Sequence, residues 1–341
     1  MLPFLGLIMN KANQLAVKLQ NRISRKLFRV KQLLFPIWFA WNPGRRLFFS
    51  LYDSASFKAK ESLLRDYIQI SGVKWIPRDF NFLISIAGKK LTVPIRSNHF
   101  AGDMGLALCV LGLDAPIKNL YALIFRSPDI SRRVLIVDVG ANYGQNLLIF
   151  CCHSMKVVAF EPNPQCWPEL DRVLDVNAFS PRMIKAALGS TPGETLLKWP
   201  HGQTWLSSLS DPNSKHLDDC NAFSSCVVPV VTLDSQVKAA KDIVLIKIDV
   251  EGFESSVLNG GRNLLLSNDC LVIFEHDIDR VQGRRELWEF FSGIGYSIFR
   301  PCLDASLPLD CFMSIEQYLS DPNPNHVAMR ATSEFSFLAK Y

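Results

Sequence analysis

The sequence lacks the long apolar runs and regular cysteine spacings that mark several common protein classes. No apolar stretch reaches the roughly 20 residues that a membrane-spanning helix needs. The nine cysteines form no C-x-x-C pair, and no set of cysteines and histidines has zinc-site spacing. Residues 1–9 are apolar but have no basic start and no evident cleavage site, so we expect no signal peptide. We therefore expect buried free thiols in a reducing, cytoplasmic compartment.

Acidic residues are scarce at the start of the chain. Residues 1–60 contain eleven Lys or Arg and one acid, Asp53, which gives a net charge of +10, whereas the remaining residues carry −5. Residues 10–35 show apolar positions at helical spacing with basic residues around them. A basic amphipathic helix suits a peripheral contact with an anionic membrane through residues 10–45, and the alternative is packing on the protein's own body. No recognisable nucleic-acid module accompanies the charge, so we expect no nucleic-acid partner.

Composition and periodicity divide the chain into three parts. Residues 1–60 form the basic extension, residues 61–126 a cap region, and residues 127–341 the main domain. The cap contains a helical pattern at 57–70, which begins in the extension, and a hairpin of strands 80–87 and 91–95 that turns at residues 88–90.

Strand and helix patterns alternate along the main domain. Its predicted strands are 134–139, 157–160, 183–188, 194–199, 227–233, 243–249, 270–275, 296–299 and 327–330. Several are continuous β-branched apolar runs, which is typical of strands that are buried on both faces of a parallel sheet. Helical patterns lie between them, with Gly260 and Gly261 interrupting the one at 254–267. The fold class is therefore α/β, with a doubly wound, mostly parallel sheet.

Polar residues gather where four of these strands end. They are Asp138 to Gln145, Glu161, Asp249 to Glu251, and Glu275 with His276. The carboxyl ends of parallel strands share one edge, which is where ligands bind in open α/β sheets. Glu161 follows Gly140 by 21 residues, at the end of the next strand. A carboxylate at that place can accept hydrogen bonds from both hydroxyls of a ribose.

The turn after the first strand distinguishes between two kinds of cofactor. A dinucleotide fingerprint needs a glycine at its middle position, where the backbone approaches the pyrophosphate, but this chain has Asn142 there. An asparagine offers amide contacts to a ligand that carries a carboxylate and an amine, such as the methionine part of S-adenosylmethionine. Asp138 could pair with that amine directly or through water. A nicotinamide-dependent oxidoreductase is therefore the weaker alternative.

Five motifs together resemble the FkbM-type methyltransferases. In order they are Asp138-Val-Gly-Ala-Asn-Tyr-Gly144, Phe160-Glu-Pro-Asn-Pro164, Ala186-Ala-Leu-Gly189, Thr232-Leu-Asp234 and Ile246-Lys-Ile-Asp-Val-Glu-Gly-Phe-Glu254. The resemblance covers about residues 130–276 and not the N-terminal part. It implies a Rossmann-like sheet of seven strands, S-adenosylmethionine as cofactor, and O-methylation of a hydroxyl on a sugar, glycolipid or natural product. The acceptor is then a small molecule or glycan.

The resemblance also implies a set of site residues. Cofactor contacts are expected at Asp138, Gly140, Asn142, Tyr143, Gly144, Glu161, Pro162, Ala187 and Asp249. Methyl transfer aligns the acceptor oxygen with the sulfonium methyl group, and a base helps because a neutral alcohol is a poor nucleophile. The candidate catalytic residues are Asp249, Glu251, Glu275 and His276, with His276 as either a base or a strand-end cap. No ligand spacing singles out a metal. A non-catalytic docking protein on the same fold is the remaining alternative.

Overall fold

The structure is a computed structural model that describes residues 78–111, 115–154, 156–200, 207, 209, 223–238, 243–276, 279–302 and 308–340. These residues fall into two compact units. One contains 78–82 and 93–108, and the other contains 83–92 and the described residues from 109 onwards. The predicted helices at 10–35 and 57–70 and the predicted membrane contact of residues 10–45 lie outside the described residues. The predicted domain borders stay predictions.

A hairpin and a helix precede the main sheet. Strands β1 (Phe80–Ile86) and β2 (Lys89–Ile95) confirm the predicted hairpin, and α4 (Phe100–Leu111) follows. The turn is shorter and starts one residue earlier than predicted: it consists of Ala87 and Gly88, whose φ angles of 51° and 76° are typical of the two left-handed residues of a tight hairpin turn. Within the first unit, the Arg96 guanidinium donates to both carboxylate oxygens of Asp103 at 2.8–2.9 Å.

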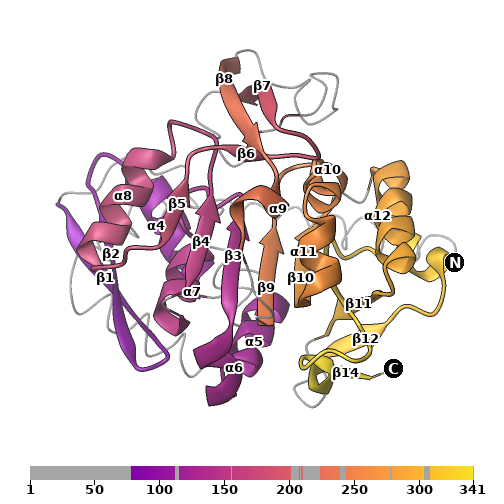
Figure 1. The fold of residues 1–341 in the computed structure, drawn as a ribbon. Helices are drawn as coiled ribbons and strands as arrows, with labels where there is room; N and C mark the ends of the chain where they lie inside the picture. The colour runs from indigo at the N-terminus through magenta and orange to yellow at the C-terminus, as the bar shows by residue number, and fades with distance from the viewer. Residues whose placement is uncertain are drawn as a thin grey trace, which may run out of the picture. The chain divides into compact units, whose positions relative to one another are not determined.

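The second unit is built on one nine-stranded sheet, seen in Figure 1. The strand order is β14-β12-β11-β13-β10-β9-β3-β4-β5. In chain order the strands are β3 (Leu135–Val139), β4 (Val157–Phe160), β5 (Arg182–Ile184), β9 (Ile243–Ile248), β10 (Asp269–Glu275), β11 (Ser297–Pro301), β12 (Leu309–Cys311), β13 (Asn325–Met329) and β14 (Ala339–Lys340). The seven strands from β11 to β5 match the predicted sheet, and β12 and β14 extend it beyond β11.

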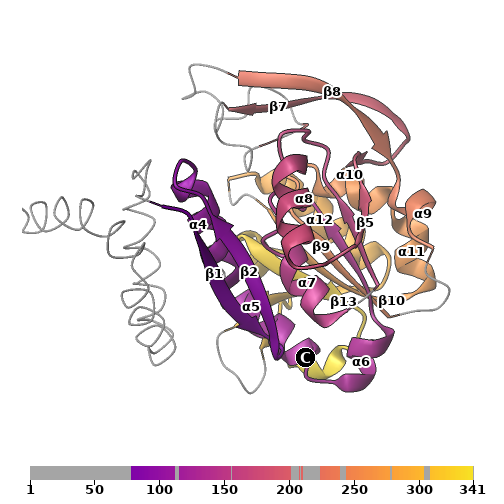
Figure 2. The same ribbon diagram turned by 90° about the vertical axis from the view of Figure 1, so that its left-hand side faces the viewer.

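Helices cover both faces of this sheet. They are α5 (Ala115–Ile124), α6 (Pro128–Arg133), α7 (Leu147–His153), α8 (Trp167–Val176), α9 (Leu233–Gln236), α10 (Glu254–Asn259), α11 (Arg262–Ser267), α12 (Val281–Gly293), α13 (Ile315–Leu319) and the 3₁₀ helix η2 (Ser336–Leu338). Figure 2 shows α7 and α8 on one side and α9, α10 and α11 on the other. The predicted helix at 254–267 is divided at Gly260 and Gly261, as the sequence indicated.

The central strands are buried on both faces, as their apolar runs predicted. Every residue of β9 is buried, and its neighbours β3 and β10 run parallel to it. Val244, Ile246 and Ile248 face the large core that also contains residues of α10, α11 and α12. Because side chains alternate along a strand, Lys247 points to the opposite face. A charged residue there needs a partner, since burying an isolated charge is very costly.

A second, three-stranded sheet stands at the carboxyl ends of the main strands (Figure 1). It consists of β6 (Ala187–Leu188), β7 (Gly193–Pro200) and β8 (Phe223–Val231). The prediction of one strand over 183–188 was wrong, because the chain leaves the main sheet after Ile184, the last residue of the edge strand β5, and Ala187 pairs with Val230 of β8. The predicted strand at 227–233 starts earlier, at Phe223, and ends before Thr232, whose hydroxyl caps α9.

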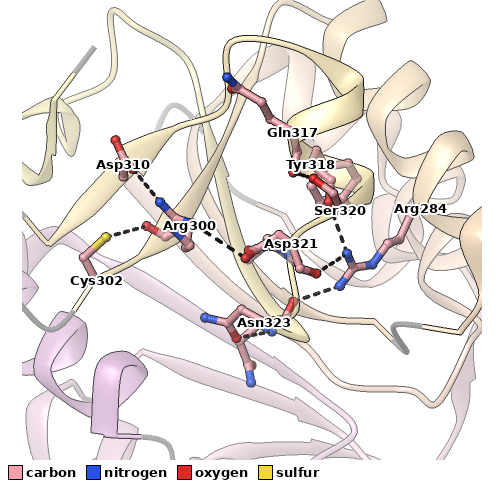
Figure 3. Close-up of polar contacts among 11 residues, drawn as sticks. Arg284, Arg300, Cys302, Asp310, Gln317, Tyr318, Ser320, Asp321 and Asn323 are labelled. Atoms are coloured by element: carbon pink, nitrogen blue, oxygen red, sulfur yellow. Dashed lines mark hydrogen bonds and ion pairs between the residues drawn. The ribbon is translucent and has the colours of Figure 1, made fainter.

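One buried arginine ties the C-terminal elements to α12. Figure 3 shows the Arg284 guanidinium donating to the backbone oxygens of Tyr318, Asp321 and Asn323, at 3.1, 2.7 and 2.8 Å. Arg284 is fully buried. Tyr318 belongs to the last turn of α13, whereas Asp321 and Asn323 lie in the segment that follows this helix. The bonds fix α12 against the segment that enters β13.

No single helix of the described residues is both long and apolar enough to cross a membrane. Two successive helical stretches, Gly102–Leu111 and Pro116–Ile124, reach that length and composition only when they are taken together.

Candidate active site

Three loops meet at the carboxyl ends of β3, β4 and β9. The backbone N–H groups of Gly140 and Ala141 both donate to the carbonyl oxygen of Phe160, each at 3.0 Å. The N–H of Asp249 donates to the carbonyl oxygen of Val139, also at 3.0 Å. These bonds continue the sheet past its last paired residues. They hold the three loops at the point where strand order reverses, which is the usual ligand position in such sheets.

Gly140 is required for this close approach. Its φ angle is +85°, in the left-handed region that favours glycine, and a Cβ atom there would overlap with the carbonyl oxygen of Asp249. Asn142 also has a positive φ angle, 49°, which asparagine tolerates better than most residues. The sequence motif thus places Gly140 and Asn142 at the positions where the turn needs a left-handed backbone conformation.

Glu161 is held by the backbone of two loops. Its Oε2 atom accepts the N–H of Asn142 and its Oε1 atom accepts the N–H of Asn163, both at 2.7 Å. Burial raises the pKa of this carboxyl to about 7, against the effect of the two N–H groups, and the charge of Asp249 raises the pKa as well. Each carboxylate oxygen has two lone pairs, so each can accept one further hydrogen bond from a ligand.

A cavity with about 540 Å³ of atom-free space, part of it open to solvent, lies among these loops. Its lining includes seven of the predicted site residues, namely Gly140, Asn142, Glu161, Pro162, Ala187, Asp249 and Glu251. The remaining wall is mostly apolar and comes from Val139, Phe160, Ala186, Leu188, Leu197, Leu209 and Val250, with Ser207 as a polar member. One polar edge and one apolar wall suit a ligand with a ribose and a flat aromatic ring.

The other five predicted residues lie outside that lining, although all belong to the described chain. Tyr143 and Gly144 follow in the same turn, and Gly144, with φ at +96°, packs against Leu170 and Leu148. Asp138 is buried within β3, Glu275 lies beside Lys247 at the end of β10, and His276 is buried beside Glu254. The structure therefore brings together the predicted ribose and adenine contacts but not every predicted catalytic group.

Asp138 is buried inside the sheet rather than exposed at its edge. It lies opposite Lys247 in the β3–β9 register, and both side chains are almost fully buried. Burial raises the pKa of Asp138 to about 7, and the charge of Lys247 acts in the opposite direction. Among the described residues, its Oδ2 atom has no hydrogen-bond partner. The predicted contact with the cofactor amine therefore stays a prediction.

Lys247 connects the carboxylates of the neighbouring strands. Its Nζ atom lies 3.8 Å from Oδ2 of Asp249 and 3.9 Å from Oε2 of Glu275. These distances give the buried ammonium group the charged partners that its position in the sheet requires. Asp249 lines the cavity with its side chain 24% exposed, whereas Glu275 lies beyond it.

His276 does not have the geometry of a general base. Its Nδ1 atom lies 2.7 Å from Oε2 of Glu254, and its Nε2 atom lies 3.2 Å from the carbonyl oxygen of Arg280. The ring is buried. A base needs a free nitrogen within reach of the substrate proton, but both nitrogens are engaged within the protein. The contacts favour the alternative interpretation, a residue that holds the end of β10, and the catalytic role of His276 stays a prediction.

Residues 138–298 match a family model that is described as the Methyltransferase FkbM domain. This segment has the sequence signature of an FkbM methyltransferase domain. The match confirms the resemblance that the five motifs suggested, and it makes S-adenosylmethionine the cofactor of the domain. The curated proteins compared with the chain include no match.

Solved structures of similar fold include several methyltransferases. One is the methyltransferase FkbM from Methylobacillus flagellatus, with 16% identity, coverage of 66% of this chain and 58% of that one, and a TM-score of 0.37. Another is the 16S rRNA N2 G1207 methyltransferase of T. thermophilus in complex with AdoMet and guanosine, with 13% identity, coverage of 74% and 51%, and a TM-score of 0.37. An rRNA methylase from Streptococcus thermophilus has 11% identity, coverage of 64% and 97%, and a TM-score of 0.35. The chain thus spans about half of the length of the first two structures.

The cavity of the FkbM domain fits its cofactor. Glu161 keeps one acceptor position on each oxygen for the ribose hydroxyls, and Ala187, Leu188 and Leu197 form the apolar wall that an adenine ring needs. The glycine at position 140 leaves the space that a side chain would fill. When bound, S-adenosylmethionine supplies an electrophilic methyl group on a sulfonium.

The sequence did not indicate several residues of this site. Asn163 is fully buried; its N–H holds Glu161, and its Nδ2 atom donates to the Ser207 hydroxyl at 2.9 Å. Its place two residues after Glu161, inside a quoted motif, was the available signal. Leu197 and Leu209 carried none, because the strand and loop that contain them reach the site only through tertiary packing.

The buried Asp138 makes the stability of the FkbM domain depend on pH. Its pKa is about 7 in the folded protein and near 3.9 in an unfolded chain, so the folded state binds more protons between these values. Stability then falls as pH rises from about 4 to 7, by about 1.4 kcal/mol per pH unit from this group. We expect Asp138→Asn to remove that part of the slope in urea denaturation at pH 5 to 8. The exposed Asp175→Asn is the control, and equal slopes in the wild type and Asp138→Asn would contradict the assignment.

Proposed function

We propose that this protein is an S-adenosylmethionine-dependent methyltransferase that methylates a hydroxyl group of a small molecule, such as a sugar, glycolipid or natural product. The observation that carries the proposal is the Glu161 carboxylate. It is fixed by two backbone N–H groups at the end of β4, on the rim of a cavity with an apolar wall. This is where a ribose must lie if the adenine contacts that wall.

The acidic character of the cavity supports a hydroxyl acceptor. Asp249 and Glu251 line it, and Glu275 lies near them through the shared partner Lys247. Carboxylates accept hydrogen bonds from hydroxyl groups and can take up the proton that an attacking alcohol must lose. The same carboxylates repel phosphate groups, which makes a neutral hydroxylated acceptor more favourable than a polyanion.

The residues of the domain contribute mainly by positioning. Glu161 and Asn142 hold the nucleoside part, and the loop at 249–251 faces the side from which an acceptor approaches. Alignment of the acceptor oxygen with the methyl carbon is the largest contribution that a protein makes to such a displacement.

The test uses the full chain and methyl-labelled S-adenosylmethionine. A panel of glycans, glycolipids, small alcohols and amines is incubated with the protein, and labelled product and S-adenosylhomocysteine are measured. We expect transfer to at least one hydroxyl compound and none to the amines. Transfer to amines alone would refute O-methylation, and failure to bind S-adenosylhomocysteine in calorimetry would refute the enzyme assignment itself.

A non-catalytic docking protein on the same fold predicts a different result. Such a protein would tolerate substitution of Glu161 and Asp249 without loss of its partner. The cavity and its fixed carboxylate argue against this alternative, because together they form a site that suits a ribose and an adenine ring.

A further inference from the structure

The loop after β9 contains two consecutive residues in the left-handed region. Glu251 has a φ angle of 52° and Gly252 one of 98°. This conformation is uncommon for a residue with a long side chain, and it persists only where the surrounding structure enforces it. Glu251 also lines the cofactor cavity. The loop therefore places Glu251 at the cavity with a backbone conformation that needs support.

A closed ring of contacts supplies this support. The N–H of Gly252 donates to Oε1 of Glu254 at 2.8 Å, and Oε2 of Glu254 lies 2.7 Å from Nδ1 of His276. Nε2 of His276 lies 3.2 Å from the carbonyl oxygen of Arg280. The Arg280 guanidinium then returns to the loop, donating to the carbonyl oxygen of Glu251 at 3.3 Å. We call Glu254, His276 and Arg280 the brace.

The side chains of the brace pack directly against two glycine residues. A Cβ atom at Gly252 would overlap with the Arg280 guanidinium, and one at Gly283 would lie 2.5 Å from Nε2 of His276. The carbonyl oxygen of Arg280 also accepts the N–H of Arg284, the buried arginine of α12, at 3.1 Å. The brace is thus anchored in the first turn of a helix whose position is fixed.

We propose that the brace of Glu254, His276 and Arg280 holds Glu251 at the acceptor side of the cavity, where Glu251 takes the proton of the hydroxyl that is methylated. This inference rests on the proposed function. Glu251 is the catalytic residue in it, and the three residues of the brace are positioning residues.

The step is balanced as a substitution at carbon. The acceptor oxygen forms a bond to the methyl carbon, and the carbon–sulfur bond of the sulfonium breaks with its electron pair going to sulfur. The hydroxyl proton goes to the Glu251 carboxylate and from there to water. The products are a methyl ether, a neutral thioether and one released proton.

The charges around Glu251 suit this role. Glu251 is an exposed residue at the cavity. Partial loss of water around its carboxyl and the neighbouring Asp249, Glu275 and Glu254 carboxylates hold its pKa above the usual range, while Arg280 lowers it. A base with a pKa near the working pH combines a usable ionised fraction with a strong tendency to take up a proton.

The experiment compares four variants of the full chain: Glu251→Gln, Arg280→Met, Arg280→Lys and, as a matched control on the exposed side of α12, Arg285→Met. S-adenosylhomocysteine binding is measured by calorimetry, and methyl transfer to the hydroxyl panel is measured from pH 6 to 10. In parallel, the titration of ¹³C-labelled glutamate carboxyls is followed by NMR, which needs no acceptor.

We expect Glu251→Gln to bind S-adenosylhomocysteine within about threefold of the wild type but to lose methyl transfer by roughly 100-fold or more. Arg280→Met should move the acid limb of the pH profile, and the NMR midpoint of Glu251, upward by about 0.5–1 pH unit, with Arg280→Lys restoring most of the shift. Arg285→Met should match the wild type.

Full transfer by Glu251→Gln, or an unchanged Glu251 midpoint in Arg280→Met, would overturn the proposal. Absence of S-adenosylhomocysteine binding in the wild type would instead refute the proposed function, so the two failures are distinguishable. If the wild type binds but methylates no hydroxyl in the panel, the NMR midpoints still decide whether the brace controls Glu251.

Discussion

Replacing Glu161 by alanine should weaken binding of S-adenosylhomocysteine by about 100-fold, which corresponds to about 2.7 kcal/mol. The substitution removes the acceptor for the ribose hydroxyls. It also leaves the backbone N–H groups of Asn142 and Asn163 without the carboxylate that orients both loops. Loss of a charge-assisted hydrogen bond alone is worth about 1.5–3 kcal/mol. Isothermal calorimetry on the wild type and the variant measures the effect.

The pH dependence of S-adenosylhomocysteine binding provides a second test of the role of Glu161. Ribose hydroxyls donate to the ionised carboxylate, and the pKa of Glu161 is about 7 without ligand. Wild-type affinity should therefore fall about tenfold per pH unit below 7, and Glu161→Ala should show no such dependence. Glu194→Ala, on the exposed start of β7, is the control. A variant that binds as tightly as the wild type at every pH would remove Glu161 from the cofactor site.

Gly140→Ala should damage both the fold and the cavity. The new Cβ atom would overlap with the carbonyl oxygen of Asp249, and a φ angle of +85° is unfavourable for any residue with a side chain. The loops after β3 and β9 would have to separate, which breaks the bond from Asp249 to Val139. We expect the free energy of unfolding to fall by about 3–5 kcal/mol and cofactor affinity to fall by at least 100-fold.

The control for this substitution is Gly193→Ala. A Cβ atom at Gly193 meets nothing within 4 Å, and its φ angle is not left-handed. Gly193→Ala should therefore leave the urea midpoint of unfolding nearly unchanged. This variant controls for the general effect of replacing a glycine by alanine in the domain. Stability of Gly140→Ala equal to that of Gly193→Ala would show that the loops are not held as closely as the structure indicates.

The main sheet could be predicted from the sequence because each of its central strands is marked by a short apolar run of neighbouring residues. Continuous β-branched runs such as residues 243–248 are compatible with little except a strand that is buried on both faces. Gly140 and Glu161 were found for the same reason, since their spacing follows from the geometry of one strand, one turn and the next strand. The split of 183–188 could not be predicted, because it is set by partners on two different sheets.

His276 shows where residue type alone is insufficient. A histidine at a strand end near other polar residues has the expected chemistry for a base, and its sequence position gives no sign of what lies beside each ring nitrogen. The two neighbours, Glu254 and the carbonyl group of Arg280, come from segments on either side of it in the chain. Only the packing of α12 against the loop after β9 reveals that the ring is enclosed.

The anchoring of Arg284 has a consequence for how this protein can be divided. The family match ends at residue 298, but the three carbonyl groups that receive the Arg284 guanidinium belong to residues 318–323. An expression fragment that ends at residue 298 would keep the buried Arg284 guanidinium but lose the three carbonyl oxygens that accept its hydrogen bonds. The folded domain therefore extends beyond its recognisable sequence signature, at least as far as Asn323.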